Sequence, residues 1–125
     1  MARPRFADIL RRPSGEILLP SARWCDGSLC RLRGLQFRRT LGAGEGLILV
    51  GGSDSVAKSS IHMFFVLFPI AAVWINSAGE VTHKTLALPW RPYYASPTAA
   101  RYVLEASPDY LERFIVGEKI DFAFL

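Results

Sequence analysis

The sequence predicts a closed or sandwiched antiparallel β domain with two small helices. Short apolar segments alternate with turns rich in Gly, Pro, Asn and Ser, and the longest apolar run is rich in strand-forming residues. The chain has 125 residues, of which 50% are hydrophobic and 21% charged, so it has the size and composition of one domain with a single core. We expect one domain over residues 1–125, with about residues 1–5 frayed.

The longest apolar run is Ile61–Ile75, interrupted only by His62 and Pro69. A membrane span needs roughly 20 apolar residues, which is more than this run provides. A buried helix would contain Pro69, at a cost of about 3 kcal/mol. Because Phe, Val, Ile and Trp favour strands, we expect two buried strands, Ile61–Phe68 and Ile70–Ile75, bent or bulged at Pro69.

Before this run, the pattern predicts short strands and one helix. Ser28 is suited to cap a helix, and the leucines that follow it recur at helical spacing, so we expect a helix from Leu29 to about Phe37. Gly34 would cost roughly 1 kcal/mol inside that helix, so we expect a packing reason for it. The strands expected here are Phe6–Leu10, Glu16–Leu19 (ended by Pro20), Ala22–Cys25 and Leu47–Val50, with a polar connection over Val56–Ser60.

After the run, the pattern predicts a hairpin, a further strand, a short helix and a final strand. Asn76–Gly79 has the composition of a hairpin turn, and Ser107 followed by Pro108 is typical of a helix start. The expected strands are Glu80–Leu88, Ala99–Ala106 and Ile120–Phe124, and the helix would end at Arg113 or Phe114.

The net charge of +4 is unevenly distributed along the chain. Residues 1–40 contain nine Arg against Asp8, Glu16 and Asp26, whereas the remaining residues carry six basic and eight acidic side chains. Arg suits bidentate binding of anions, so an accessory protein that binds nucleic acid through its first 40 residues is one function to test. The simpler interpretation is solvated charge, with some Arg paired to the acidic C-terminal half.

The cysteines and the N-terminus lead to expectations about compartment and metals. No apolar segment follows the N-terminal Arg residues, so we expect no cleaved secretory signal and a cytoplasmic location. Cys25 and Cys30 are then expected to be buried, reduced thiols. The two His and two Cys are not spaced as metal ligands, so we expect neither a metal nor another cofactor.

Three blocks of this sequence form a pattern when taken together. The blocks are Arg31-Leu32-Arg33-Gly34-Leu35 with Phe37-Arg38; Gly44-Glu45-Gly46-Leu47 with Ser60-Ile61-His62, Phe64-Phe65 and Phe68-Pro69-Ile70; and Leu88-Pro89-Trp90-Arg91 with Val103-Leu104-Glu105 and Val116-Gly117-Glu118. In their order and spacing they resemble a prokaryotic family, the domain of unknown function 192 (DUF 192). The resemblance covers about residues 16–122. It implies a compact, jelly-roll-like antiparallel β sandwich or partly closed barrel, and no established activity.

The sequence departs from the family pattern at two places. Ala71 stands where an Asp usually follows the Pro-Ile of the second block, so a polar role of that carboxylate is missing or replaced here. A Gly common after the Leu-Glu segment is replaced by Ser107–Arg113, the expected short helix.

The few polar residues within the resembling blocks are the candidates for ligand binding. Our first hypothesis is a module that binds an anionic or aromatic small ligand through His62, Trp90, Arg91, Arg33 and Arg38. An indole can stack on a ring, and a guanidinium can bind a phosphate or carboxylate. Structural roles compete with this hypothesis, because a His in an apolar strand is often a satisfied core residue and a Trp on a Pro-bounded loop often caps a sandwich.

Glu105 lies in an apolar strand, and a buried carboxylate needs a cationic partner. Arg33 and Arg38 could pair with Glu45, Glu105 or Glu118, and we expect a structural ion pair between Glu105 and one of these two Arg. An enzyme is the alternative function, and it would need His62 or His83 beside Glu105 in one cleft as an acid–base pair. The sequence does not indicate an oligomeric state.

Overall fold

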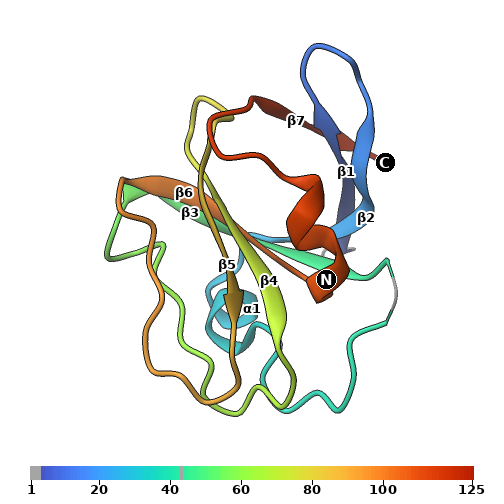
Figure 1. Cartoon of the computed structure of the whole chain (residues 1–125). Helices are drawn as coiled ribbons and strands as arrows, with labels where there is room; N and C mark the ends of the chain where they lie inside the picture. Colours follow the sequence, from blue (N-terminus) through green and yellow to red (C-terminus); the bar gives the residue numbers. More distant parts are fainter. Residues whose placement is uncertain (1–3, 43) are drawn as a thin grey trace.

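The computed structural model describes residues 4–42 and 44–125 and contains one curled sheet of seven strands (Figure 1). The order across the sheet is β5-β4-β6-β3-β2-β1-β7. The strands are β1 (Arg5–Arg11), β2 (Ile17–Cys25), β3 (Gly46–Ser55), β4 (Ile70–Ile75), β5 (Val81–Ala87), β6 (Ala100–Ala106) and β7 (Ile120–Phe124). The helices are α1 (Ser28–Arg33) and the 3-10 helix η1 (Pro108–Arg113).

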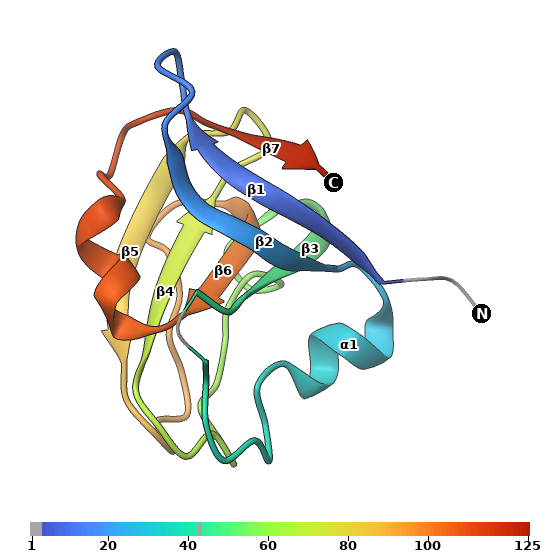
Figure 2. The same ribbon diagram turned by 90° about the vertical axis from the view of Figure 1, so that its right-hand side faces the viewer.

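The sheet forms a half-barrel, which confirms the predicted partly closed β fold. Neighbouring strands are antiparallel, except that β2 and β3 pair in parallel through Arg23–Cys25 and Leu47–Leu49. The two edge strands approach each other where a bridge joins Glu80, just before β5, to Lys119, just before β7. Figure 2 shows η1 beside β4 and β5, whereas α1 lies outside the curl of the sheet.

Strand β4 is buried along its whole length, β6 and the first half of β3 are largely buried, and these strands divide the core in two. Along β6, Leu104 faces the core inside the half-barrel, where it packs with Ile9, Ile48 and Phe114. Its neighbour Val103 faces a second core on the outer side of the sheet, which includes Trp74, Met63 and Val66. Because side chains alternate along a strand, Glu105 also faces the outer core.

The first half of the central apolar run is not a strand, so the prediction of a strand over Ile61–Phe68 is wrong. Only Ile61 forms a bridge, with Tyr94, and the following residues make turns over the outer core. Met63 and Val66 are buried, but Phe64, Phe65 and Leu67 are exposed. An apolar segment can therefore cover a core with a few of its side chains and leave the others in solvent. The second half is β4, as predicted.

Several predicted boundaries also differ. Pro20 does not end a strand: β2 continues through it, and Pro20 and Ser21 form a bulge opposite Asp8, whose carboxylate accepts the Ser21 N–H at 2.8 Å. Proline is tolerated there because the pairing of β2 with β3 begins only at Arg23. β3 extends to Ser55, five residues beyond the predicted strand end at Val50.

The first helix is shorter than predicted, whereas the second helix has its predicted bounds and the C-terminal strands agree with prediction. α1 ends at Arg33 because Gly34 adopts a positive φ of 51°, and the second helix is of the 3-10 type. The strands β5, β6 and β7 and the turn at Asn76–Gly79 are confirmed. β1 already begins at Arg5, and the rest of the expected frayed end, residues 1–3, lies outside the described residues.

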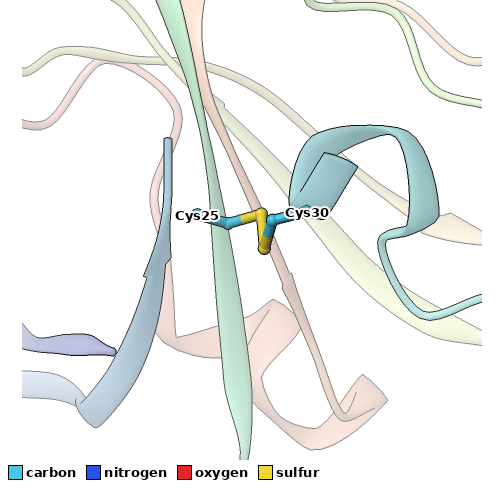
Figure 3. Close-up of a disulfide and its surroundings, with 2 residues drawn as sticks. All are labelled: Cys25 and Cys30. Carbon is cyan, nitrogen blue, oxygen red and sulfur yellow. A yellow bond between two sulfur atoms is a disulfide. The ribbon is translucent and has the colours of Figure 1, made fainter. Parts of the chain in front are cut away.

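Cys25 and Cys30 form a disulfide that joins the end of β2 to α1 (Figure 3). The expectation of reduced thiols is therefore wrong. That expectation rested on the compartment and on the spacing of the cysteines. Only two residues separate β2 from α1, and the chain turns between them so that the Cα atoms of Cys25 and Cys30 lie 5.7 Å apart. Because stable disulfides are typical of oxidising compartments, this bond does not support the cytoplasmic expectation. Within residues 4–42 and 44–125, neither helix is long and apolar enough to cross a membrane.

Candidate functional site

A hollow of about 210 Å³ lies between α1, the segment Ser60–His62 and the outer face of the sheet. We call it the Glu105 hollow. Its polar lining is Arg31, Arg33, Gln36, Ser60, His62 and Glu105, and its apolar lining includes Leu35, Leu49, Ile61 and Val66. The polar groups come from segments far apart in the chain, so only the folded protein brings them together.

Glu105 is the buried polar residue of this hollow. The alternation along β6 directs its side chain to the outer face, and the residue is only 5% exposed. Among the described residues, no side chain or amide donates a hydrogen bond to its carboxylate, and no cation forms an ion pair with it. Burial therefore raises the pKa of Glu105 to about 7.

Gly34 allows the chain to pass close to this carboxylate. A Cβ atom on Gly34 would lie 3.4 Å from Oε1 of Glu105. The positive φ of Gly34 also ends α1 and turns the chain toward Leu35, which is buried in the outer core. This is the packing reason expected for Gly34.

Three basic side chains stand around the mouth of the hollow. Arg31, Arg33 and His62 are all exposed and all line it. Nδ1 of His62 accepts the Phe64 N–H at 3.2 Å, which leaves Nε2 to carry the proton of the neutral ring. The hollow thus combines a buried hydrogen-bond acceptor at its base with donors of positive or neutral charge at its rim.

Arg38 is held elsewhere, by Glu45. Nη2 of Arg38 lies 2.8 Å from Oε1 of Glu45, and Nη1 contacts the other carboxylate oxygen. The hydrogen bonds from Arg38 lower the pKa of Glu45, and the Gly42 N–H adds to this effect. The predicted pairing of Arg38 with Glu105 is thus replaced by a local pair, and Arg33 forms no ion pair with Glu105 in the described structure.

A larger groove of about 560 Å³ lies on the other side of α1. It is lined by Phe6, Arg23, Leu29, Arg38 and Leu47 among others, and it shares Arg33, Gly34 and Leu35 with the Glu105 hollow. The segment Arg33–Leu35 therefore separates two recesses, and Arg33 is the one candidate residue that borders both.

Trp90 and Arg91 do not line either recess. Trp90 is exposed and contacts the edge of the Phe65 ring, with centroids 5.0 Å apart. His83 also lies elsewhere, packed on the Trp74 ring at 5.4 Å. Of the five proposed ligand-binding residues, the structure thus brings His62 and Arg33 together at the hollow, with Arg38 near Arg33 in the groove.

Sequence reasoning missed Ser60, Gln36 and Arg31 as lining residues, because a polar residue at or near the surface does not indicate a site until the fold places it beside others. Gly34 did carry such a signal, since its presence in a helical pattern called for a packing reason. Ala71 does not enter the hollow: it belongs to the residues of β4 that alternate with Trp74 and so faces the inner core. Its lack of a carboxylate leaves the hollow unchanged.

Two of the Arg near the N-terminus form ion pairs with the C-terminal half in the described part of the chain. Nε of Arg11 lies 2.7 Å from Glu118, and Arg12 pairs with Asp121. Arg5 stacks over the Phe124 ring at 4.1 Å. These contacts confirm the expectation that some N-terminal Arg pair with the acidic C-terminal half. Within the described residues, no group of three His, Cys, Asp or Glu is arranged to hold a metal ion.

Comparison with solved structures shows the same fold in two bacterial proteins. A protein of Sinorhizobium meliloti, described as a candidate transcription regulator, superposes with a TM-score of 0.80 at 19% identity over 96% of this chain and 94% of that chain. A protein of unknown function from Novosphingobium aromaticivorans gives a TM-score of 0.79 at 18% identity, over 96% and 93% of the two chains. At these identities, the likeness concerns the fold.

Sequence comparison shows the family. A UPF0127 protein of Thermococcus sibiricus is 30% identical over 116 residues, which are 90% of this chain and 73% of that protein. A UPF0127 protein of Pyrococcus furiosus is 27% identical over 90% of this chain and 96% of that protein. The model of the family described as "Uncharacterized ACR", domain of unknown function 192, matches residues 11–122. The chain therefore belongs to the DUF 192 family, in agreement with the three blocks of its sequence.

Proposed function

We propose that this protein is a binding protein for a small anionic molecule that also carries a hydrogen-bond donor, held in the Glu105 hollow. The observation that supports this proposal is the Glu105 carboxylate, which is buried without a donor from the described chain and faces a hollow rimmed by Arg33 and His62. No side-chain oxygen that is cut off from solvent lacks a partner among the described residues, so the Glu105 carboxylate is reached from the hollow that it lines. A ligand donor in the hollow would bind this carboxylate where the described chain supplies no donor.

The lining determines which chemistry the ligand would have. An amine, amide or hydroxyl group would donate to Glu105 at the base, while a carboxylate or phosphate would accept from Arg33 and His62 at the rim. The volume of about 210 Å³ suits a molecule of metabolite size, smaller than most drug-like ligands. Apolar walls such as Leu49 and Val66 would contact its carbon skeleton.

Glu105, Arg33 and His62 also belong to the three blocks by which the sequence resembles its family. The first block contributes Arg33 and Gly34, the second Ser60 and His62, and the third Glu105. Their meeting at one hollow, from separate parts of the chain, supports a role beyond stability.

Thermal-shift melting tests this proposal, with single amino acids, hydroxy acids, nucleoside monophosphates and sugar phosphates as probes. We expect a probe that raises Tm, and calorimetry should then show its Kd weakened at least about tenfold by Glu105→Gln and by Arg33→Gln. Arg39→Gln is the matched control, because Arg39 is exposed and outside the lining. Binding that tolerates both lining substitutions, or no Tm change with any probe, would contradict the proposal.

An acid–base enzyme is the second candidate function. Glu105 and His62 line the same hollow, and a carboxyl group with a pKa of about 7 can both donate and accept protons near neutrality. The test is incubation of each bound probe with the protein, followed by mass spectrometry of the probe. Conversion that is lost in His62→Gln, while binding is retained, would favour the enzyme over a binding protein.

A further inference from the structure

Three aromatic side chains cluster at the surface, apart from both recesses. The rings of Phe37 and Phe65 stack with centroids 4.9 Å apart, and Trp90 contacts Phe65 at 5.0 Å. Their exposed fractions are 64%, 45% and 51%. We call these three residues the aromatic tip. An exposed group of large apolar side chains of this kind is typical of a surface that contacts an apolar or interfacial partner.

The loops that carry the aromatic tip expose further apolar side chains. Phe64 and Leu67 flank Phe65, while Leu88 and Tyr93 lie beside Trp90 in the chain, and all four are exposed. In Figures 1 and 2, the loops after α1, before β4 and after β5 gather at one end of the molecule. The turn between β1 and β2 and the turn between β4 and β5 lie at the opposite end.

The backbone holds the three tip residues in an unfavourable conformation. Their φ angles are 65°, 61° and 67°, in the left-handed region that side chains other than Gly rarely adopt. Main-chain hydrogen bonds fix this arrangement: the Phe37 N–H donates to the Phe65 carbonyl at 2.9 Å, and the Trp90 N–H to the Met63 carbonyl at 2.8 Å. The fold thus keeps exposed rings in place against a backbone preference, a pattern found at functional surfaces.

The charge around the aromatic tip is of one sign. The segments 27–44, 61–69 and 88–94, which supply the tip and its neighbours, contain no Asp or Glu. They carry Arg31, Arg33, Arg38, Arg39 and Arg91, and of these only Arg38 forms an ion pair in the described part of the chain. The partner of this end is therefore expected to be apolar at its contact and negatively charged around it.

We propose that the aromatic tip docks the protein on the surface of an anionic lipid bilayer, with Phe37, Phe65 and Trp90 inserted at the level of the lipid headgroups. Aromatic side chains favour that interface, and Arg91 and Arg39 would lie against anionic headgroups. Leu67 and Leu88 fit insertion into lipid, whereas they offer nothing to a stacked base. One face of Phe65 is already covered by Phe37, which also disfavours stacking of a single-stranded nucleic acid.

Vesicle flotation of the full chain tests this proposal, using phosphatidylcholine vesicles with and without about 30 mol% phosphatidylglycerol. We expect partitioning that increases with phosphatidylglycerol and falls with salt. Phe65→Asn and Trp90→Asn should each lower the partition coefficient at least about tenfold, because each removes an inserted ring. Asn adopts a positive φ readily, so both variants are expected to fold. Ile115→Asn is the control, since Ile115 is 58% exposed outside these loops.

Tryptophan fluorescence gives a second readout. Trp74 is fully buried and Trp24 is partly buried against Tyr102 and Phe122, so a blue shift on adding vesicles would report Trp90. Trp90→Phe should keep vesicle binding but lose the shift. The proposal is overturned if vesicles do not bind, or bind equally to Phe65→Asn and Trp90→Asn. Without vesicle binding, loss of single-stranded RNA binding in these two variants would assign the aromatic tip to nucleic acid. Loss of a concentration-dependent dimer would assign it to a second copy of the chain.

Discussion

Gly34 and Glu105 approach each other so closely that a Cβ atom on Gly34 would lie 3.4 Å from Oε1 of the carboxylate. The contact joins the end of α1 to β6. Both residues line the Glu105 hollow.

Substitution of Gly34 by Ala separates backbone strain from the effect on Glu105. Gly34→Ala and Gly15→Ala both place a side chain at a positive φ, so each should lower the free energy of unfolding by about 1 kcal/mol. Gly15 has no atom within 4 Å of its added Cβ, which makes it the matched control. Only Gly34→Ala should raise the pKa of Glu105 further, because its methyl group excludes water from the carboxylate. Carboxyl ¹³C NMR titration measures this shift, and an equal Glu105 titration in both variants would contradict the proposed contact.

Glu105 should make the protein less stable at high pH. Burial raises its pKa from 4.5 to about 7 in the folded state, so the folded protein binds more protons than the unfolded chain between these values. The free energy of unfolding then falls as pH rises from about 4.5 to about 7, by about 3 kcal/mol, and stays level above that range.

Glu105→Gln removes this titration, and urea denaturation at several pH values measures the difference. The variant should match wild type near pH 4.5 and exceed its stability by about 3 kcal/mol near pH 8. Glu112→Gln, at an exposed position, should change stability little at either pH. A Glu105→Gln variant that is less stable than wild type at about pH 8 would show that the ionised carboxylate has a stabilising partner.

Reduction of the disulfide should release α1 before the sheet unfolds. None of the six residues of α1 is buried, so the bond between Cys25 and Cys30 is a main attachment of this helix. Closing so short a loop stabilises the fold by about 2 kcal/mol in the chain-entropy description. Denaturation with and without a phosphine reductant measures the loss, and trypsin should cleave faster after Arg31 and Arg33 once the bond is reduced. The Cys25→Ser/Cys30→Ser double variant should not respond to reductant. Two reactive thiols in the native, unreduced protein would contradict the bond.

The same substitution should destabilise the protein strongly at Trp74 and very little at Trp90. The Trp74 ring is fully buried, and its Nε1 donates to the Ser59 carbonyl at 2.8 Å. Trp74→Phe leaves that carbonyl without its donor and opens a small cavity, so we expect a loss of about 2–4 kcal/mol in the free energy of unfolding. Trp90→Phe changes an exposed ring and should cost less than about 0.5 kcal/mol. If guanidinium denaturation shows equal losses in the free energy of unfolding for both variants, the Trp90 ring is packed in the protein and not exposed.

Local patterns predicted the strands well where alternation and turn chemistry agree. Ile70–Ile75 is the apolar strand β4, and Asn76–Gly79 turns it into β5 as its composition indicates. The prediction of a strand over Ile61–Phe68 was wrong, because the high apolar content of this segment was interpreted as a strand buried on both faces. Covering loops use the same residue types as strands, and only contacts such as that of the Met63 N–H with the Arg91 carbonyl distinguish the two.

The candidate site was only partly predictable, because its residues meet through long-range pairing. The sequence pointed to Arg33, His62 and Glu105 as residues of interest, and all three line one hollow. The expected partner of Glu105 could not be deduced, since Arg38 lies in a loop close to Glu45 and that shorter-range pair forms instead. Trp90 was expected at the same site but lies in the aromatic tip.

By itself, the sequence determined a mostly β domain of the DUF 192 family, with β4 at the centre of its core. Strand propensity, alternation and turn residues act within a few neighbours, so they are readable along the chain. Only the tertiary structure decided that Cys25 bonds to Cys30, that half of the apolar run covers the sheet as a loop, and that Glu105 meets Gly34 without a partner among the described residues. These features depend on strand register and on how loops cross the sheet, which arise from contacts between distant residues.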